Sequence, residues 1–130
     1  MDVRLELVMV PVSDADRAIA FYVDRAGFVL DHDVRVDETV RFIQVTPPGS
    51  ACSIMLDSFS GAMAPGSQRG LQAVVDDADA ARAEMLGRGV EVSEVDEQPW
   101  GRFVHFADPD GNTWALQQLP SWAPARDAES

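Results

Sequence analysis

The chain contains an internal repeat that occupies both of its halves. Residues 14–25 (DADRAIAFYVDR) and 77–88 (DADAARAEMLGR) align after a shift of 63 positions, and each segment is followed by a glycine and an apolar run. Six residues of the first segment meet an identical residue in the second: Asp14, Ala15, Asp16, Ala18, Ala20 and Arg25. Solenoid folds need at least three repeat units. A long repeat that occurs only twice therefore predicts two copies of one small module packed against each other.

Both halves have the same predicted order of elements: a strand, a helix and three further strands. Alternating or continuous apolar runs predict strands, and Ser or Asp caps and glycine stops predict the helix ends. In the first half, strands are expected over residues 3–12, 28–36, 39–46 and 51–56, and a helix from Ser13 or Asp14 to near Gly27. In the second half, strands are expected over residues 71–75, 90–95, 102–106 and 113–119, and a helix over 77–88.

The fold class follows from this order. One helix for every four strands can cover only one face of a sheet, so the other face curves around a second module or a ligand. We expect an α+β fold in which two tandem βαβββ modules form a curved mixed sheet cup with the helices on the outer face. The chain is a single domain with module one over 3–57, a Gly-, Ser- and Pro-rich linker over 58–69, module two over 70–119 and a flexible tail over 120–130.

Composition excludes several classes of function. The net charge of −12 argues against nucleic acids and anionic membranes as partners, and it suits either a cationic ligand or simply solubility. Every basic residue is an arginine, so Schiff-base chemistry and a P-loop lysine are excluded. The single Cys52, the lack of a signal peptide and the lack of a long apolar span predict a cytoplasmic protein.

The motifs, taken in order, resemble a known superfamily. They are VSD (12–14) leading into RAIAFY (17–22), AGF (26–28), GL (70–71), AR (81–82), GRGV (87–90) and FADPDGN (106–112). In this order they resemble the vicinal oxygen chelate superfamily, which contains glyoxalase I, bleomycin resistance proteins and extradiol dioxygenases. The resemblance covers residues 3–119. We interpret the DPDGN segment as a structural turn before the last strand, not as a calcium loop.

The resemblance also implies where a metal would be bound. In that superfamily, His, Gln or Glu side chains from the first and last strands of each module hold a metal that binds two oxygens of the substrate. The corresponding positions here are Leu7, Met55, Leu71 and Ala115, and none of them offers a nitrogen or oxygen donor. We therefore expect a metal-free cup with no cofactor, and we do not expect glyoxalase I or extradiol dioxygenase activity.

The candidate ligand-binding surface follows if those four positions face inward. Period-two alternation then adds their neighbours on the same face. The expected surface is mainly apolar with a few polar groups: Leu7, Met9, Ser53, Met55, Asp57, Leu71, Ala73, Thr113, Ala115 and Gln117. Apolar walls with sparse polar groups are typical of small-molecule pockets. The same surface also suits packing against a partner module.

Three further residues are candidates near this surface. Trp100 lies in a Gln-Pro-Trp-Gly loop beside a strand with Phe103 and His105, where it would either stack on a flat or cationic ligand or make a packing contact. His105 and Asp57 are the candidate acid and base groups, although a lone strand histidine is also a common structural residue. Trp114 is expected in the core.

Three functions stay open at this point. The first is a metal-independent small-molecule binding protein that sequesters a drug or metabolite. The second is a metal-free lyase, isomerase or cyclase that uses acid and base side chains in the same cup. The third is a diverged glyoxalase-like protein that acts through a protein partner. A homodimer is expected in each case, because pairing would cover the apolar edges of the cup.

Overall fold

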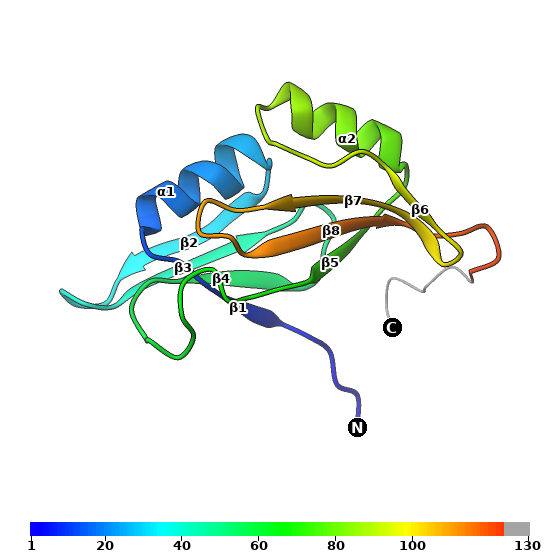
Figure 1. Ribbon diagram of the computed structural model, residues 1–130. Coiled ribbons are helices and arrows are strands. Elements are labelled where there is room, and N and C mark those ends of the chain that lie inside the picture. Colours follow the sequence, from blue (N-terminus) through cyan, green and yellow to red (C-terminus); the bar gives the residue numbers. More distant parts are fainter. Residues whose placement is uncertain (124–130) are drawn as a thin grey trace.

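The computed structural model describes residues 1–123 and arranges them as two similar modules (Figure 1). The first module comprises β1 (Leu7–Pro11), α1 (Ala15–Ile19), a π-helical continuation η1 (Ala20–Arg25), β2 (Val29–Arg35), β3 (Arg41–Thr46) and β4 (Ser53–Asp57). The second comprises β5 (Leu71–Val75), α2 (Ala78–Gly87), β6 (Asp96–Gln98), β7 (Gly101–Ala107) and β8 (Thr113–Gln118). The expected tail lies mostly outside the described residues.

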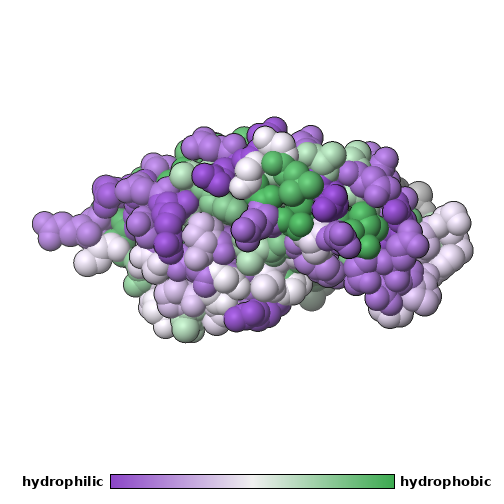
Figure 2. Space-filling model, turned by 45° about the horizontal axis from the view of Figure 1, so that its top comes forward, coloured by the Kyte–Doolittle hydropathy of each residue, from purple (hydrophilic) through white to green (hydrophobic). Residues whose placement is uncertain are grey.

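Each module forms its own four-stranded mixed sheet. The strand order is β1-β4-β3-β2 in the first and β5-β8-β7-β6 in the second. In both sheets the first strand runs parallel to the last, and the other neighbours are antiparallel. The α+β class and the repeated βαβββ order are thus confirmed. The helices lie on the same side of the molecule (Figure 1), and this side is mainly hydrophilic with a hydrophobic patch near its middle (Figure 2).

The repeated sequence produces repeated contacts at the start of each helix. The carboxylate of Asp14 accepts a hydrogen bond from the Arg17 backbone amide at 3.1 Å, and Asp77 accepts one from Ala80 at the same distance. These bonds satisfy amides that have no partner inside the helix. Both predicted helix starts are therefore confirmed.

A second repeated contact ties each helix to its own sheet. Arg41 on β3 lies 2.9 Å from Asp16 in the first turn of α1, and Arg102 on β7 lies 2.8 Å from Asp79 in the first turn of α2. Residues 16 and 79 are equivalent in the repeat, so the duplication extends from the helix caps to the ion pairs. Negative charge in a first helical turn is also favourable to the helix dipole.

Two predicted strands are wrong in their extent. The first strand begins at Leu7 rather than at residue 3, and residues 90–95 do not form a strand, since β6 begins at Asp96. Val90 is buried in the core. The Ser93 amide donates to the His105 carbonyl, but the return bond from the His105 amide goes to the Ser93 hydroxyl. A side chain thus takes the place of a backbone group, and no regular ladder forms.

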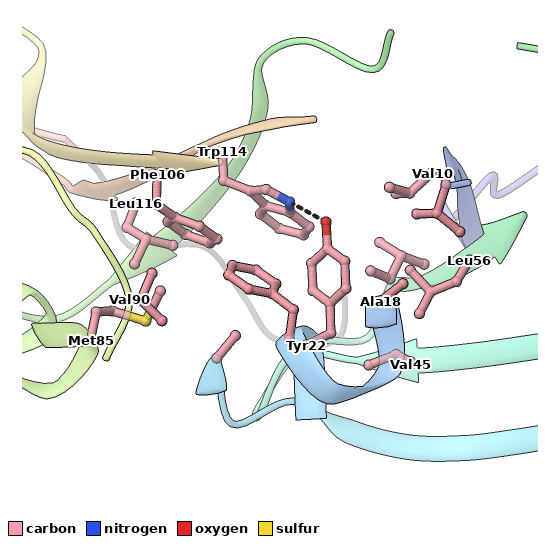
Figure 3. Packing of buried hydrophobic residues seen from close by; sticks show 14 of the residues in the cluster. Val10, Ala18, Tyr22, Val45, Leu56, Met85, Val90, Phe106, Trp114 and Leu116 are labelled. Atoms are coloured by element: carbon pink, nitrogen blue, oxygen red, sulfur yellow. Dashed lines mark hydrogen bonds between the residues drawn. The ribbon is translucent and has the colours of Figure 1, made fainter. Parts of the chain in front are cut away.

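Both modules contribute to one hydrophobic core on the helix side of the sheets. Tyr22 from η1 packs against Trp114 of β8, with ring centroids 6.0 Å apart, and the indole N–H donates to the Tyr22 hydroxyl at 3.0 Å (Figure 3). Phe106 stacks on Trp114 at 5.8 Å. Trp114 is only 4% exposed, which confirms its predicted place in the core. Within residues 1–123, no helix has the length and hydropathy needed to cross a membrane.

The DPDGN turn is bonded to the first module through buried groups. The Asp108 carboxylate accepts hydrogen bonds from the Tyr22 hydroxyl at 2.7 Å and from the Asn112 side chain at 2.7 Å. Asn112 also donates to the Pro11 carbonyl at 2.8 Å. Burial and the neighbouring Asp108 charge raise the pKa of Tyr22, so its hydroxyl stays protonated and keeps donating. The turn is structural, as its sequence predicts.

We predict that Tyr22→Phe destabilises the fold without changing its shape. The substitution leaves the Asp108 carboxylate and the Trp114 N–H each short of one buried partner. The expected loss in the free energy of unfolding is about 1 to 3 kcal/mol. Urea denaturation followed by tryptophan fluorescence measures it, with Ser58→Ala, which removes an exposed hydroxyl, as the control. Equal midpoints for Tyr22→Phe and wild type would contradict a stabilising role for this network.

Candidate functional site

The face of the second sheet that points away from the helices is the candidate site. We call it the inner face of sheet two. The register pairs His105 with Ala115, Phe103 with Gln117 and Gln72 with Ala115. Paired residues on neighbouring strands share a face. This face therefore consists of Gln72, Val74, Phe103, His105, Thr113, Ala115 and Gln117.

The structure corrects the expected orientation of β5. Leu71 and Ala73 pair with Trp114 and Leu116, and all four pack in the core rather than on the inner face. A register shift of one residue turns every side chain of a strand to the other face. Gln72 consequently takes the inward position that the sequence analysis assigned to Leu71. The signal that could have revealed this was the one polar side chain inside an otherwise apolar strand.

The first sheet has an inner face of its own, and the expected residues lie on it. Leu7 pairs with Ser53, and Met9 pairs with Met55. Ser53 is 5% exposed, and its hydroxyl lies 2.6 Å from the Thr46 hydroxyl and accepts from the Gln44 amide at 3.2 Å. Ser53 is therefore bonded within its own sheet, which leaves Leu7, Met9 and Met55 as the apolar part of this surface.

Asp57 has a structural environment. Its carboxylate accepts hydrogen bonds from the Phe59 amide at 3.0 Å, the Ser60 amide at 2.9 Å and the Ser60 hydroxyl, and it is only 4% exposed. Burial acts to raise the pKa of Asp57, but these hydrogen bonds outweigh it, and the pKa is lowered. A carboxylate with a lowered pKa, bonded in this way, holds the start of the linker, and it is poorly suited to proton transfer near neutral pH.

His105 and Trp100 lie on the second module. The His105 ring is parallel to Phe103 within 6°, with centroids 6.2 Å apart, and its Nε2 atom is 3.7 Å from an Asp96 oxygen. Trp100 occupies the two-residue turn between β6 and β7 and is 55% exposed. Among residues 1–123, no hydrogen bond or ion pair joins His105 to Asp57, which belongs to the other sheet. The two candidate acid and base groups are thus not brought together.

A cavity of about 620 Å³ lies against the inner face of sheet two. Its lining brings together three predicted residues, His105, Thr113 and Ala115, with the unpredicted Gln72. Ligand cavities usually measure about 300 to 1,000 Å³. The size and the mixture of apolar walls with a few polar groups are therefore appropriate for a small molecule.

Two other cavities have a different lining. One of about 410 Å³ lies between the sheets, beside the turn over residues 47–50, and holds Ser53, Leu71 and Ala73. One of about 220 Å³ lies between the end of η1 and α2. The first also contains the polar side chains of Ser50 and Gln72, and the second those of Glu84 and Arg88. The cavity on the inner face of sheet two is larger than either, and it is the one of the three that contains His105.

The residues at the positions where the superfamily places its metal do not fit a metal ion. The side chains of Leu7, Met55 and Ala115 have no nitrogen or oxygen donor, and the Nε2 atom of Gln72, the residue that replaces Leu71 there, already donates to Gln117 at 2.7 Å. In the described part of the chain, no three His, Cys, Asp or Glu side chains gather closely enough to share an ion. A single amide oxygen does not make a site for zinc or iron.

The family model named Glyoxalase/Bleomycin resistance protein/Dioxygenase superfamily matches residues 4–116. The chain belongs to this superfamily, as its motifs predict. The fold, with its two βαβββ modules, agrees with that membership.

Several relatives share most of the chain. TnmS3, described as an antibiotic binding protein from Streptomyces sp. CB03234, is 41% identical over 92% of this chain and 98% of its own, with a TM-score of 0.84. A glyoxalase/bleomycin resistance protein from the same organism is 43% identical over 88% of this chain and all of its own, with a TM-score of 0.78. Uncharacterized protein YetH of Bacillus subtilis is 29% identical over 88% of this chain and 98% of its own.

We predict that Asp57→Asn lowers stability in a pH-dependent way. The lowered pKa of Asp57 in the folded state means that its contribution is complete above its unfolded value, about 3.9, and is lost as the pH falls through the folded value. The variant should lose about 1 to 2 kcal/mol at pH 7, and the difference should shrink below pH 4 or so.

Urea unfolding between neutral and strongly acid pH measures this difference. Asp24→Asn, which removes the same charge from an exposed helical position, is the control. A difference between wild type and Asp57→Asn that stays constant down to acid pH would show that the ionised carboxylate is not what stabilises the linker.

Proposed function

We propose that this protein binds a small molecule on the inner face of sheet two, without a metal, and sequesters a drug or metabolite. The observation that carries the proposal is the open, mainly apolar cavity of about 620 Å³ to which Gln72 and His105 contribute polar groups. TnmS3, a relative 41% identical over almost the whole chain, is described as an antibiotic binding protein, which supports the same class of ligand.

Sequestration also requires less of the site than catalysis does. A binding protein needs shape, apolar area and a few oriented polar groups, and the inner face supplies them. Proton-transfer chemistry needs an acid and a base within reach of one substrate. Asp57 lies on the other sheet with its oxygens bonded to the linker, so His105 has no such partner among the predicted residues.

A metal-independent enzyme is the second candidate, and one contact favours it. The His105 Nε2 atom lies 3.7 Å from an Asp96 carboxylate oxygen, so an imidazole and a carboxylate lie together beside the cavity. A lyase, isomerase or cyclase would use this pair for proton transfer. Both side chains are about half exposed, so a bound molecule can reach them.

We predict that the chelator-treated protein is stabilised by aromatic or cationic antibiotics. A ligand at about 100 times its Kd adds about 2.7 kcal/mol to the free energy of unfolding. That amounts to a rise in melting temperature of several degrees for a domain of this size. Thermal-shift measurements on a panel of such compounds, with metal analysis of the same preparation, test the proposal.

The same experiment separates the alternatives. Recovery of the bound compound unchanged supports sequestration, and its chemical conversion supports the enzyme. Stoichiometric zinc, nickel or iron that is required for the shift would contradict metal-independent binding. Absence of any shift across the panel would favour the third function, a cup that serves a protein partner.

We further propose that the functional unit is a homodimer. Every residue of β2 is exposed, including the apolar Val29 and Val34, which are 54% and 53% exposed. The outer edges of β1 and β5 also have no neighbouring strand within residues 1–123. A second copy of this chain has complementary surfaces of the same kind, and its pairing would remove them from water.

Sedimentation equilibrium at micromolar concentration tests the dimer. We predict twice the 14.1 kDa of a single chain, and a shift toward monomer when Val34→Asp places a charge on the exposed strand. Leu86→Asp, on the exposed side of α2, is the control and should stay dimeric. A wild-type monomer at these concentrations would contradict the proposal.

A further inference from the structure

We propose that Gln72 is a specificity-determining residue, whose Oε1 atom accepts a hydrogen bond from the ligand. The main-chain carbonyl of Trp100 fixes the orientation of the Gln72 side-chain amide through Gln117. The inference rests on the proposed function and names the ligand class more closely. The site would select a flat aromatic compound that carries a hydroxyl donor. Three observations carry it: a directed chain of hydrogen bonds, a close-packed glycine that keeps the chain in place, and an aromatic wall beside it.

The directed chain begins at the backbone. A main-chain carbonyl can only accept hydrogen bonds. Because the Gln117 Nε2 atom lies 2.9 Å from the Trp100 carbonyl oxygen, Gln117 must point its NH₂ group there and its oxygen away. That oxygen accepts from the Gln72 Nε2 atom at 2.7 Å. The Gln72 amide group therefore donates to Gln117, and the Gln72 Oε1 atom lies at the far end of this chain of hydrogen bonds.

The middle of this chain is held by packing. Gln117 is 9% exposed. A Cβ atom at Gly101 would lie 3.0 Å from the Gln117 Nε2 atom and 2.7 Å from the Gln118 carbonyl oxygen. Only glycine at this position lets the hairpin turn that carries Trp100 approach so closely. The side-chain amide of Gln117 consequently has little freedom to flip, and its fixed orientation also fixes that of the Gln72 amide.

The free end of the chain lies at the cavity. Gln72 is exposed and lines the cavity of about 620 Å³ together with His105 and Ala115. Ala115 is the residue opposite both, so its small side chain leaves space between them. The His105 ring lines the cavity, and the parallel ring of the buried Phe103 lies behind it. A flat ring can stack there while a hydroxyl on its edge donates to Gln72.

The test compares two probes that differ only in the donor. 2-Naphthol carries a hydroxyl, and 2-methoxynaphthalene carries a methyl ether that cannot donate. We expect the wild-type protein, as purified, to bind 2-naphthol about fivefold more tightly than 2-methoxynaphthalene. Isothermal titration measures this difference, which is the usual contribution of one neutral hydrogen bond. Gln72→Leu should abolish the preference by weakening 2-naphthol alone.

Two variants separate the relay from a general effect on the cavity. Gln117→Leu should reduce the preference, because the Gln72 amide is then free to present either end. Leu86→Ala, on the exposed side of α2 and outside the inner face of sheet two, should keep it. Equal affinities of the wild type for both probes, or a preference that survives in Gln72→Leu, would overturn the inference.

The outcomes also distinguish this inference from the proposed function. Equal, measurable binding of both probes overturns the role of Gln72 and leaves small-molecule binding in place. If neither probe binds, the flat hydroxylated class is wrong, and the antibiotic panel decides separately whether the protein binds small molecules at all.

Discussion

The buried hydrogen bonds between the DPDGN turn and the first module are the interaction on which the rest of the structure depends. Asp108 and Asn112 together bond to the Tyr22 hydroxyl and to the Pro11 carbonyl, so one turn of module two reaches both the helix and the first strand of module one. Trp114 closes the network by donating to Tyr22. Buried polar groups are costly unless each is bonded, and among the described residues no buried side-chain nitrogen or oxygen lacks a partner.

This network determines which faces are left for function. The modules join through the helix side of their sheets, so the faces on that side are buried in the core. The opposite faces are therefore available to bind a ligand. The inner face of sheet two then gains a further polar side chain from β5, where Gln72 replaces the expected Leu71. The superfamily fold is thus retained, while the donors that a metal would require are missing from Leu7, Met55 and Ala115.

The features that sequence could predict are those decided locally or by repetition. The Asp14 and Asp77 caps, the glycine stops and the buried Trp114 all follow from short-range patterns, and the duplication makes the caps and the glycine stops visible twice. The register of β5 was not predictable in this way. It pairs in parallel with β8, so no tight turn sets the register. A largely apolar strand also gives no alternating pattern that would show which side chains face the core.

The site shows the same limit. The members of the inner face on β7 and β8 were predictable, because alternation along an antiparallel pair places His105, Ala115 and Gln117 together. The link between Gln72, Gln117 and the Trp100 carbonyl depends on segments far apart in the chain and on the close approach of Gly101. Likewise, Asp57 reads as a candidate acid or base from its strand position, and only its bonds to Phe59 and Ser60 reveal a structural role.

The central claim is that the inner face of sheet two binds a small molecule without a metal. An NMR titration of ¹⁵N-labelled, chelator-treated protein with the best compound from the antibiotic panel tests it most directly. Saturable amide shifts centred on Gln72, His105 and Ala115 are the predicted result. Shifts confined to the helices, or shifts that appear only after a divalent metal is added, would contradict the account.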